Sequence, residues 1–178
     1  FDSAEKACAS VNAIFRAGYR PSAIEFMERD AILCTSDFVY GPEIKVPDQV
    51  QAHLLIEVDG NDTDVLMKDL EGISEVVSGY HCGKILFAED ENQKETLWKL
   101  RRTVGEAVRH ASVYKEQDTV VPRAELPLLL AGVKEISEKY GIKSVCCGHA
   151  GDGNLHVNIL KCDLTQEQWD GVIKQAIR

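Results

Sequence analysis

Two histidines and a glycine-rich turn make segment 148–158 the part of this sequence best suited to chemistry. The Asp152-Gly153 pair between two apolar runs predicts a two-residue β-hairpin turn of type I′, which needs residues that tolerate a positive φ. In such a hairpin His149 would lie directly opposite His156, and opposed Cβ atoms are about 4.5–5.5 Å apart. Neutral imidazoles at that separation can share a divalent metal ion such as zinc. We therefore predict a C-terminal hairpin that carries His149 and His156 as metal ligands.

Two structural alternatives compete with this interpretation. A pair of strand histidines often does no more than pack or hydrogen-bond, but three glycines within six residues are costly in a strand and favour a site. Asp152 is better explained as a turn former than as a ligand. Asn158, two residues after His156, should point to the same face as that histidine. A zinc hydrolase is disfavoured, because no glutamate base accompanies the histidines as in an H-E-x-x-H motif.

Composition restricts the class of protein. Twenty basic and 29 acidic residues give a net charge of −9, which argues against a general nucleic-acid surface. An anionic substrate would need a local cationic pocket. No apolar run approaches the ~20 residues of a membrane span, and residues 1–18 do not resemble a signal peptide. The six cysteines show no C-x-x-C spacing, so we expect free thiols and a cytoplasmic location.

Hydrophobic periodicity predicts alternating helices and strands. Helices are expected over residues 3–17, 62–78, 92–111 and 123–139 and from about 165, and strands over 52–58, 84–88, 114–121, 143–149 and 154–160. Residues 23–27 and 32–39 read as extended or irregular. The order predicts an α+β fold of ferredoxin-like character, with an antiparallel-rich sheet covered on one side by helices. No G-x-G-x-x-G follows a strand, which disfavours dinucleotide binding within this segment.

Segment 148–158 also closely resembles the G-H-x-G-D-G-N-L-H-x-N signature of the C-terminal domain of FAD-linked oxidases. That family includes D-lactate, D-2-hydroxyglutarate and glycolate dehydrogenases of the vanillyl-alcohol oxidase type. Every fixed position of the signature is present. The resemblance continues upstream through L-W-K-L-R at 97–101, V-Y-K at 113–115 and D-T-V-V-P-R at 118–123, so it covers the chain from about residue 20 onward.

The resemblance implies roles for individual residues. Arg101 is implied to bind the substrate carboxylate, Lys115 to approach the substrate or the flavin, and Asn158 to hydrogen-bond one of the two. On the sequence alone these residues are also consistent with a snorkelling arginine, a solvated lysine and a polar residue at a strand end. The family's histidines bind a divalent metal together with a glutamate from an E-H-G motif. This sequence has no E-H-G, so the third ligand and the catalytic base are expected beyond Arg178, and no catalytic residue is expected within the chain.

The implied function is that of a substrate-binding cap domain, residues 1–178, of an FAD-dependent 2-hydroxy-acid dehydrogenase or oxidase. An N-terminal domain absent here would bind most of the FAD, so the fragment alone should be inactive. Some family members that recognise a dicarboxylate carry a threonine where this chain has Gly105, which favours a smaller acid of the glycolate or D-lactate type.

The expected partners follow from that implied function. They are the small 2-hydroxy acid, an unidentified electron acceptor, and either a second copy of the chain or an iron–sulfur subunit. The complete protein would be cytoplasmic or peripheral to a membrane. The alternative function is a non-catalytic metal-binding or interaction module.

Overall fold

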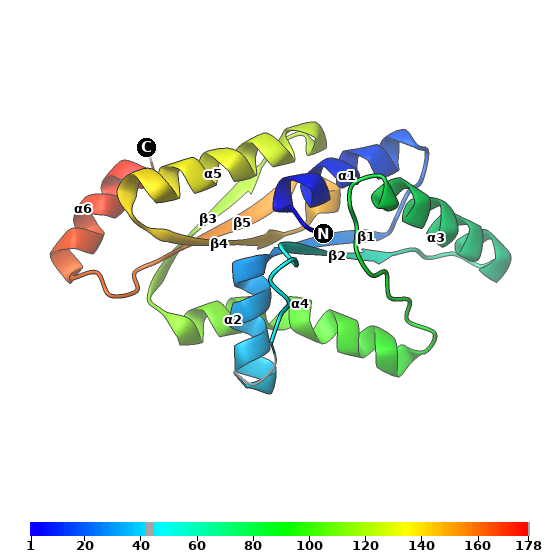
Figure 1. Cartoon of the computed structure of the whole chain (residues 1–178), viewed down its shortest axis with the longest axis horizontal. Coiled ribbons are helices and arrows are strands. Elements are labelled where there is room, and N and C mark those ends of the chain that lie inside the picture. The colour runs from blue at the N-terminus through cyan, green and yellow to red at the C-terminus, as the bar shows by residue number, and fades with distance from the viewer. Residues whose placement is uncertain (42–44, 178) are drawn as a thin grey trace.

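The chain folds around one five-stranded sheet in which every pairing is antiparallel (Figure 1). The computed structural model describes residues 1–41 and 45–177, so residues 42–44 and Arg178, the last residue of the expected domain, lie outside it. The strand order is β2-β1-β4-β5-β3. The strands are β1 (Ala23–Glu28), β2 (Ala52–Glu57), β3 (Tyr114–Val120), β4 (Lys143–Gly148) and β5 (Asn154–Leu160). The predicted α+β class with an antiparallel sheet is confirmed.

Helices cover both faces of this sheet, so the expectation of a one-sided cover is wrong. The helices are α1 (Ala4–Arg16), α2 (Arg29–Tyr40), α3 (Thr63–Ser78), α4 (Glu91–Ala111), α5 (Leu126–Tyr140) and α6 (Gln166–Ala176). Helices α1, α3 and α5 lie on one face, and α2 and α4 lie on the other (Figure 1). The central strands β1 and β4 are buried along five of their six residues. Side chains that alternate between two apolar faces need cover on both.

Each face has its own core. Phe26 and Leu155 pack beneath α1 and α5, together with Leu126 and Leu130 from α5. On the other face Met27, Val145 and Cys147 from the strands meet Val104 and Val108 from α4. Adjacent cysteines Cys146 and Cys147 therefore belong to different cores, and all six thiols are free, as expected. Among the described residues no helix is long and apolar enough to cross a bilayer.

Two elements differ from the prediction. Residues 32–39, expected to be extended or irregular, lie in helix α2, whose buried stripe includes the small polar residues Thr35 and Ser36. A hydrophobicity pattern does not reveal this buried stripe, because hydroxyl residues are part of it. The Thr35 hydroxyl can be buried because it donates a hydrogen bond to the Ala31 carbonyl at 2.7 Å. Residues 84–88, expected to form a strand, pair with no strand. A short apolar run indicates a strand only weakly, because its periodicity cannot show whether a pairing partner exists.

The prediction of a two-residue hairpin turn is wrong as well. Strand β4 ends at Gly148 and β5 begins at Asn154, and the five residues between them include a 3₁₀ turn, η2 (Ala150–Asp152). The His149 carbonyl accepts from the amides of Asp152 and Asn154 at 2.9 and 3.1 Å. Only Gly153 has a positive φ in this connection, at +76°. Cys147, rather than His149, lies opposite His156.

We expect Gly153→Ala to lower the free energy of unfolding by about 2–3 kcal/mol. A Cβ there would collide with the Val121 carbonyl oxygen, and the left-handed backbone would be strained as well. Urea denaturation measures this difference. The matched control is Gly132→Ala within α5, where a Cβ meets no atom within 4 Å; alanine should stabilise that helix by about 0.5–1 kcal/mol. Equal effects at the two glycines would contradict the prediction.

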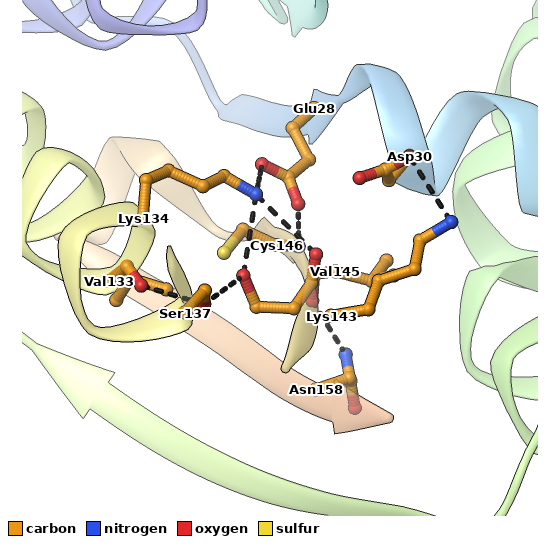
Figure 2. Close-up of polar contacts among 10 residues, drawn as sticks. Glu28, Asp30, Val133, Lys134, Ser137, Lys143, Val145, Cys146 and Asn158 are labelled. Atoms are coloured by element: carbon orange, nitrogen blue, oxygen red, sulfur yellow. Dashed lines mark hydrogen bonds and ion pairs between the residues drawn. The ribbon is translucent and has the colours of Figure 1, made fainter. Parts of the chain in front are cut away.

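A buried ion pair joins β1 to β4 and α5 (Figure 2). Glu28 Oε2 lies 2.7 Å from Lys134 Nζ, and Glu28 Oε1 accepts from the Cys146 amide at 2.6 Å. Lys134 also donates to the Ser144 carbonyl at 3.4 Å. The Glu28 side chain is 4% exposed and that of Lys134 is 35% exposed. The pair therefore stabilises the junction of three elements on the α5 face of the sheet.

Candidate functional site

Four of the five predicted site residues, namely Arg101, His149, His156 and Asn158, lie on the sheet face covered by α2 and α4. Glu25 in β1 points to this face because it alternates in phase with Met27, which belongs to that core. His156 in β5 lies opposite Cys147 and therefore shares the same face. Arg101 comes from α4, and His149 begins the connection between β4 and β5. The sheet register and one crossing helix thus bring together residues far apart in the sequence.

Glu25 holds two of these residues at once. Its Oε2 accepts a hydrogen bond from Arg101 Nε at 2.7 Å, and its Oε1 lies 2.7 Å from His149 Nδ1. The Glu25 side chain is only 7% exposed. A carboxylate so deeply buried is tolerated when its oxygens are paired, and here each oxygen has a partner. An ionised carboxylate only accepts hydrogen bonds, so a neutral His149 ring paired with Glu25 carries its proton on Nδ1 and its free lone pair on Nε2.

The two histidine rings are neighbours. Their centroids are 5.7 Å apart and their planes are almost perpendicular, at 79°. The His156 Nδ1 atom is buried and within ion-pair distance of Glu116, 3.0 Å from Oε1, although it forms no hydrogen bond. Each imidazole thus has a carboxylate beside its Nδ1, an arrangement that orients metal-binding histidines in proteins. The prediction that the rings lie together holds, although the direct cross-strand opposition behind it does not.

The thiol of Cys147 is surrounded by these charged groups but is not reactive. Burial raises the pKa of the Cys147 thiol to about 11, while the nearby Arg101 guanidinium lowers it and the carboxylates of Glu116 and Glu25 raise it. The thiol therefore stays protonated at neutral pH, and a thiolate is what a nucleophile or a metal ligand requires. Cys147 belongs to the apolar core of this face, together with Met27 and Val145.

The other two predicted residues are placed differently. Asn158 is 5% exposed and points to the site face, where its Nδ2 donates to the Val145 carbonyl at 3.3 Å (Figure 2). Lys115 in β3 lies opposite Ile159, whose side chain belongs to the core beneath α1 and α5. The exposed Lys115 side chain is therefore on the opposite face of the sheet from His156 and Asn158. The structure brings Arg101, His149 and His156 together and does not bring Lys115 to them.

The described part of the chain does not form a complete metal centre. Within residues 1–41 and 45–177, no group of three His, Cys, Asp or Glu side chains could hold a metal ion. The donor set still fits part of one, because two adjacent imidazoles backed by carboxylates are suitable ligands for zinc. The hairpin as a metal-carrying element thus stays a prediction.

Glu25 is the functional residue that sequence reasoning missed. The signal was available, since two glutamates, at 25 and 28, interrupt the apolar strand A-I-E-F-M-E. A buried charge needs a partner, so each glutamate in this strand implies a partner elsewhere in the fold. Glu25 pairs with Arg101 and His149. Glu28 pairs with Lys134 on the opposite face. Periodicity alone cannot name those partners.

A cavity of about 470 Å³ adjoins the Arg101 and Glu25 side chains. Leu55, which lies opposite Glu25 in β2, and Leu97 of α4 line it beside Arg101, whereas its lining residues Leu54 and Ile56 belong to the core on the other face of the sheet. One helical turn beyond Arg101, Gly105 is exposed, and a Cβ there would meet only open space. A ligand held by Arg101 therefore has room beside it but no side-chain donor at position 105.

Comparisons with known proteins agree with this architecture. The family model described as FAD linked oxidases, C-terminal domain, matches residues 1–178. The glycolate oxidase subunit GlcD of Escherichia coli is 33% identical over 161 residues, which is 90% of this chain and 32% of that protein. The D-lactate dehydrogenase of Anaerostipes hadrus is 29% identical over 174 residues, which is 95% of this chain and 36% of that protein. The chain therefore spans about a third of the length of these relatives.

A more local match and a solved structure complete the comparison. The D-2-hydroxyglutarate dehydrogenase of Stutzerimonas stutzeri is 40% identical over 80 residues, 44% of this chain and 17% of that protein. Among solved structures, an alkyldihydroxyacetonephosphate synthase matches 99% of this chain and 37% of its own with a TM-score of 0.61 at 13% identity. At that identity the likeness concerns the fold alone.

Proposed function

Because this chain belongs to the family of FAD-linked oxidase C-terminal domains, we propose that it is the substrate-binding domain of an FAD-dependent 2-hydroxy-acid dehydrogenase or oxidase. The observation that carries the proposal is the Arg101 guanidinium held beside two adjacent imidazoles through Glu25. This arrangement combines an anion-binding group with two imidazole rings on one face of the sheet. A 2-hydroxy acid presents the matching groups, a carboxylate and a hydroxyl.

In this proposal Arg101 binds the substrate carboxylate. Its Nε is occupied by Glu25, and the planar guanidinium has five donors in a fixed fork. The terminal NH₂ groups can therefore bind a carboxylate in the bidentate geometry that favours arginine over lysine. Since Arg101 is only 13% exposed in its side chain, that contact would be shielded from bulk water and strengthened accordingly.

His149 and His156 orient the hydroxyl side of the substrate. A divalent metal held by these two imidazoles, with a further ligand from elsewhere in the complete protein, would supply Lewis acidity to the 2-hydroxyl. FAD, held mainly by the remainder of the protein, would supply the hydride acceptor. Asn158 is proposed to support β5 from beneath rather than to contact substrate, because its amide is buried and bonded to Val145. Lys115 is given no substrate contact in this proposal, because its side chain is on the other face of the sheet.

The substrate is proposed to be a small acid of the glycolate or D-lactate type. Relatives that match most of this chain are named for glycolate and D-lactate. The open position at Gly105 offers no hydroxyl donor to a second carboxylate. The electron acceptor and any partner subunit belong to the complete protein.

Expression of the full-length protein tests the proposed function. Its absorption spectrum should show bound flavin, and a screen of D- and L-2-hydroxy acids should bleach that flavin anaerobically with at least one small acid. A flavoprotein that no 2-hydroxy acid reduces would overturn the proposal. Zinc binding without any such reduction would support a non-catalytic metal-binding module instead.

We expect His149→Ala or His156→Ala to weaken zinc binding to the full-length protein by about 100-fold or more, since each removes one of few protein ligands. Equilibrium dialysis against a zinc-selective chelator measures this affinity. The control is His110→Ala, because His110 lies in the last turn of α4 and its ring contacts Phe38, not the histidine pair. Unchanged zinc affinity in both site variants would show that the imidazoles are not metal ligands.

A further inference from the structure

The Glu25 carboxylate lies between the Arg101 guanidinium and the His149 imidazole and contacts both of them. Glu25 uses Oε2 for Arg101 and Oε1 for His149, both at 2.7 Å. The two oxygens are joined through a single carbon, so the guanidinium and the imidazole cannot separate without breaking one contact. Glu25 itself belongs to β1, which pairs on both sides with β2 and β4. The spacing between Arg101 and His149 therefore depends on one carboxylate whose backbone is held in a central strand.

Glu25 contacts Arg101 and His149 at atoms that leave their other nitrogen atoms available to a ligand. Arg101 is engaged through Nε, and among the described residues its terminal NH₂ groups have no hydrogen-bond partner. His149 is engaged through Nδ1, and its side chain is 52% exposed, so a ligand can reach Nε2. The Glu25 carboxylate thus links an anion-binding fork to an imidazole nitrogen through two contacts of 2.7 Å.

We propose that Glu25 is a positioning residue whose shared carboxylate makes the site select acids with an oxygen on the carbon next to the carboxylate. This inference rests on the proposed function and goes beyond it, because it assigns the discrimination between 2-hydroxy and 3-hydroxy acids to one residue. An added methylene moves the hydroxyl oxygen away from the imidazole once the carboxylate is bound to Arg101. Displacements of about 1 Å at such sites change reactivity by about 100-fold.

A purely structural role for Glu25 is the competing explanation, since the residue also ties α4 to the sheet. The chain contains a matched control in Glu57, at the end of β2. Its Oε2 accepts from Trp98 Nε1 at 2.8 Å, and its Oε1 pairs with Lys94 at 3.0 Å. Both partners belong to α4, so Glu57 makes the same kind of tie without touching Arg101 or His149. Glu57→Gln reports what loosening α4 does by itself.

The experiment compares oxalate with malonate, which differ by one carbon between the two carboxylates. Isothermal titration of each into the full-length protein gives the ratio of the two Kd values, and turnover of glycolate and 3-hydroxypropionate is measured alongside. Wild type should prefer oxalate. Glu25→Gln and Glu25→Asp should each reduce that preference by about tenfold or more, and should reduce the preference for glycolate over 3-hydroxypropionate in parallel. Glu57→Gln should keep both wild-type ratios.

Two variants keep the test decisive. Glu25→Asp retains the charge but is one methylene too short to reach both partners, so it reports on spacing even where the glutamine variant folds poorly. A wild-type protein without oxalate preference, or Glu25→Asp with the wild-type ratio, overturns the positioning role. A wild type that prefers oxalate but oxidises no 2-hydroxy acid overturns the proposed function and leaves the spacing role standing.

Discussion

Replacing Arg101 with alanine in the full-length protein is expected to lower kcat/KM for its 2-hydroxy acid by about 10²–10⁴-fold. Each hydrogen bond to a charged group contributes about 1.5–3 kcal/mol, and a bidentate contact supplies two of them. Initial-rate kinetics with the best acid of the substrate screen measure the loss. Arg101→Lys should fall between alanine and wild type, because lysine keeps the charge but cannot form the planar fork.

The neighbouring residue supplies the control for this prediction. Arg102 is 57% exposed in its side chain and pairs with the equally exposed Glu95 at 2.9 Å. Surface pairs of this kind contribute little, so Arg102→Ala should leave kcat/KM within about twofold of wild type. Equal losses in the two variants, or no loss in Arg101→Ala, would show that Arg101 does not bind the carboxylate.

The largest expected effect on stability comes from the opposite face of the sheet. Lys134→Met should lower the free energy of unfolding by about 2–3 kcal/mol at neutral pH, because it leaves the buried carboxylate of Glu28 without its cation. Breaking a fully buried pair costs about 3–5 kcal/mol. We expect less here because the Lys134 side chain is 35% exposed, and water screens the pair from that side. Urea denaturation measures the change.

The loss of unfolding free energy caused by Lys134→Met should be smaller at acidic pH. Burial raises the pKa of the Glu28 carboxyl, and the Lys134 ammonium opposes that rise; removing Lys134 therefore raises the pKa further. A carboxyl whose pKa is higher folded than unfolded stabilises the fold below its unfolded pKa, and that stabilisation is lost as pH rises through the folded pKa. Acidification thus protonates Glu28 in Lys134→Met and relieves the unpaired charge. The stability difference from wild type should narrow from pH 7 towards pH 5.

The double variant Glu28→Gln/Lys134→Met separates charge from packing. Removing both charges should recover most of the stability that Lys134→Met loses, because a neutral amide can still accept from the Cys146 amide where Glu28 does so now. A double variant as unstable as Lys134→Met, or a loss that does not change with pH, would show that the methylene packing of Lys134 matters and that its charge does not.

Local sequence patterns were sufficient to predict most of the helices and strands. The amphipathic periods of α3 and α4 and the apolar run of β2 predicted those elements close to their observed bounds. Helix ends follow local chemistry as well: the side chains of Ser3, Asp62, Asp90 and Thr165 accept from backbone amides at the starts of their helices. Helix α2 was missed because its buried side includes hydroxyls, and the strand at 84–88 was wrong because an apolar run does not reveal its partner.

Local sequence patterns also predicted some of the residues of the candidate site. The types and spacing of residues 148–158 were enough to predict two neighbouring imidazoles, and a motif in α4 was enough to single out Arg101. The reasoning about the turn was wrong, yet the rings meet, because His149 follows Cys147 by two residues and so begins its loop on the face that His156 occupies.

The α+β class and most local elements could be predicted from the amino-acid sequence, because they depend on interactions between neighbours along the chain. The position of Glu25 between Arg101 and His149 could not, because those residues are 76 and 124 positions away from it and meet it through the tertiary fold. The tertiary fold also decided that Lys115 lies on the other face. Both outcomes depend on strand register, since a shift of one residue turns every side chain to the opposite face of the sheet.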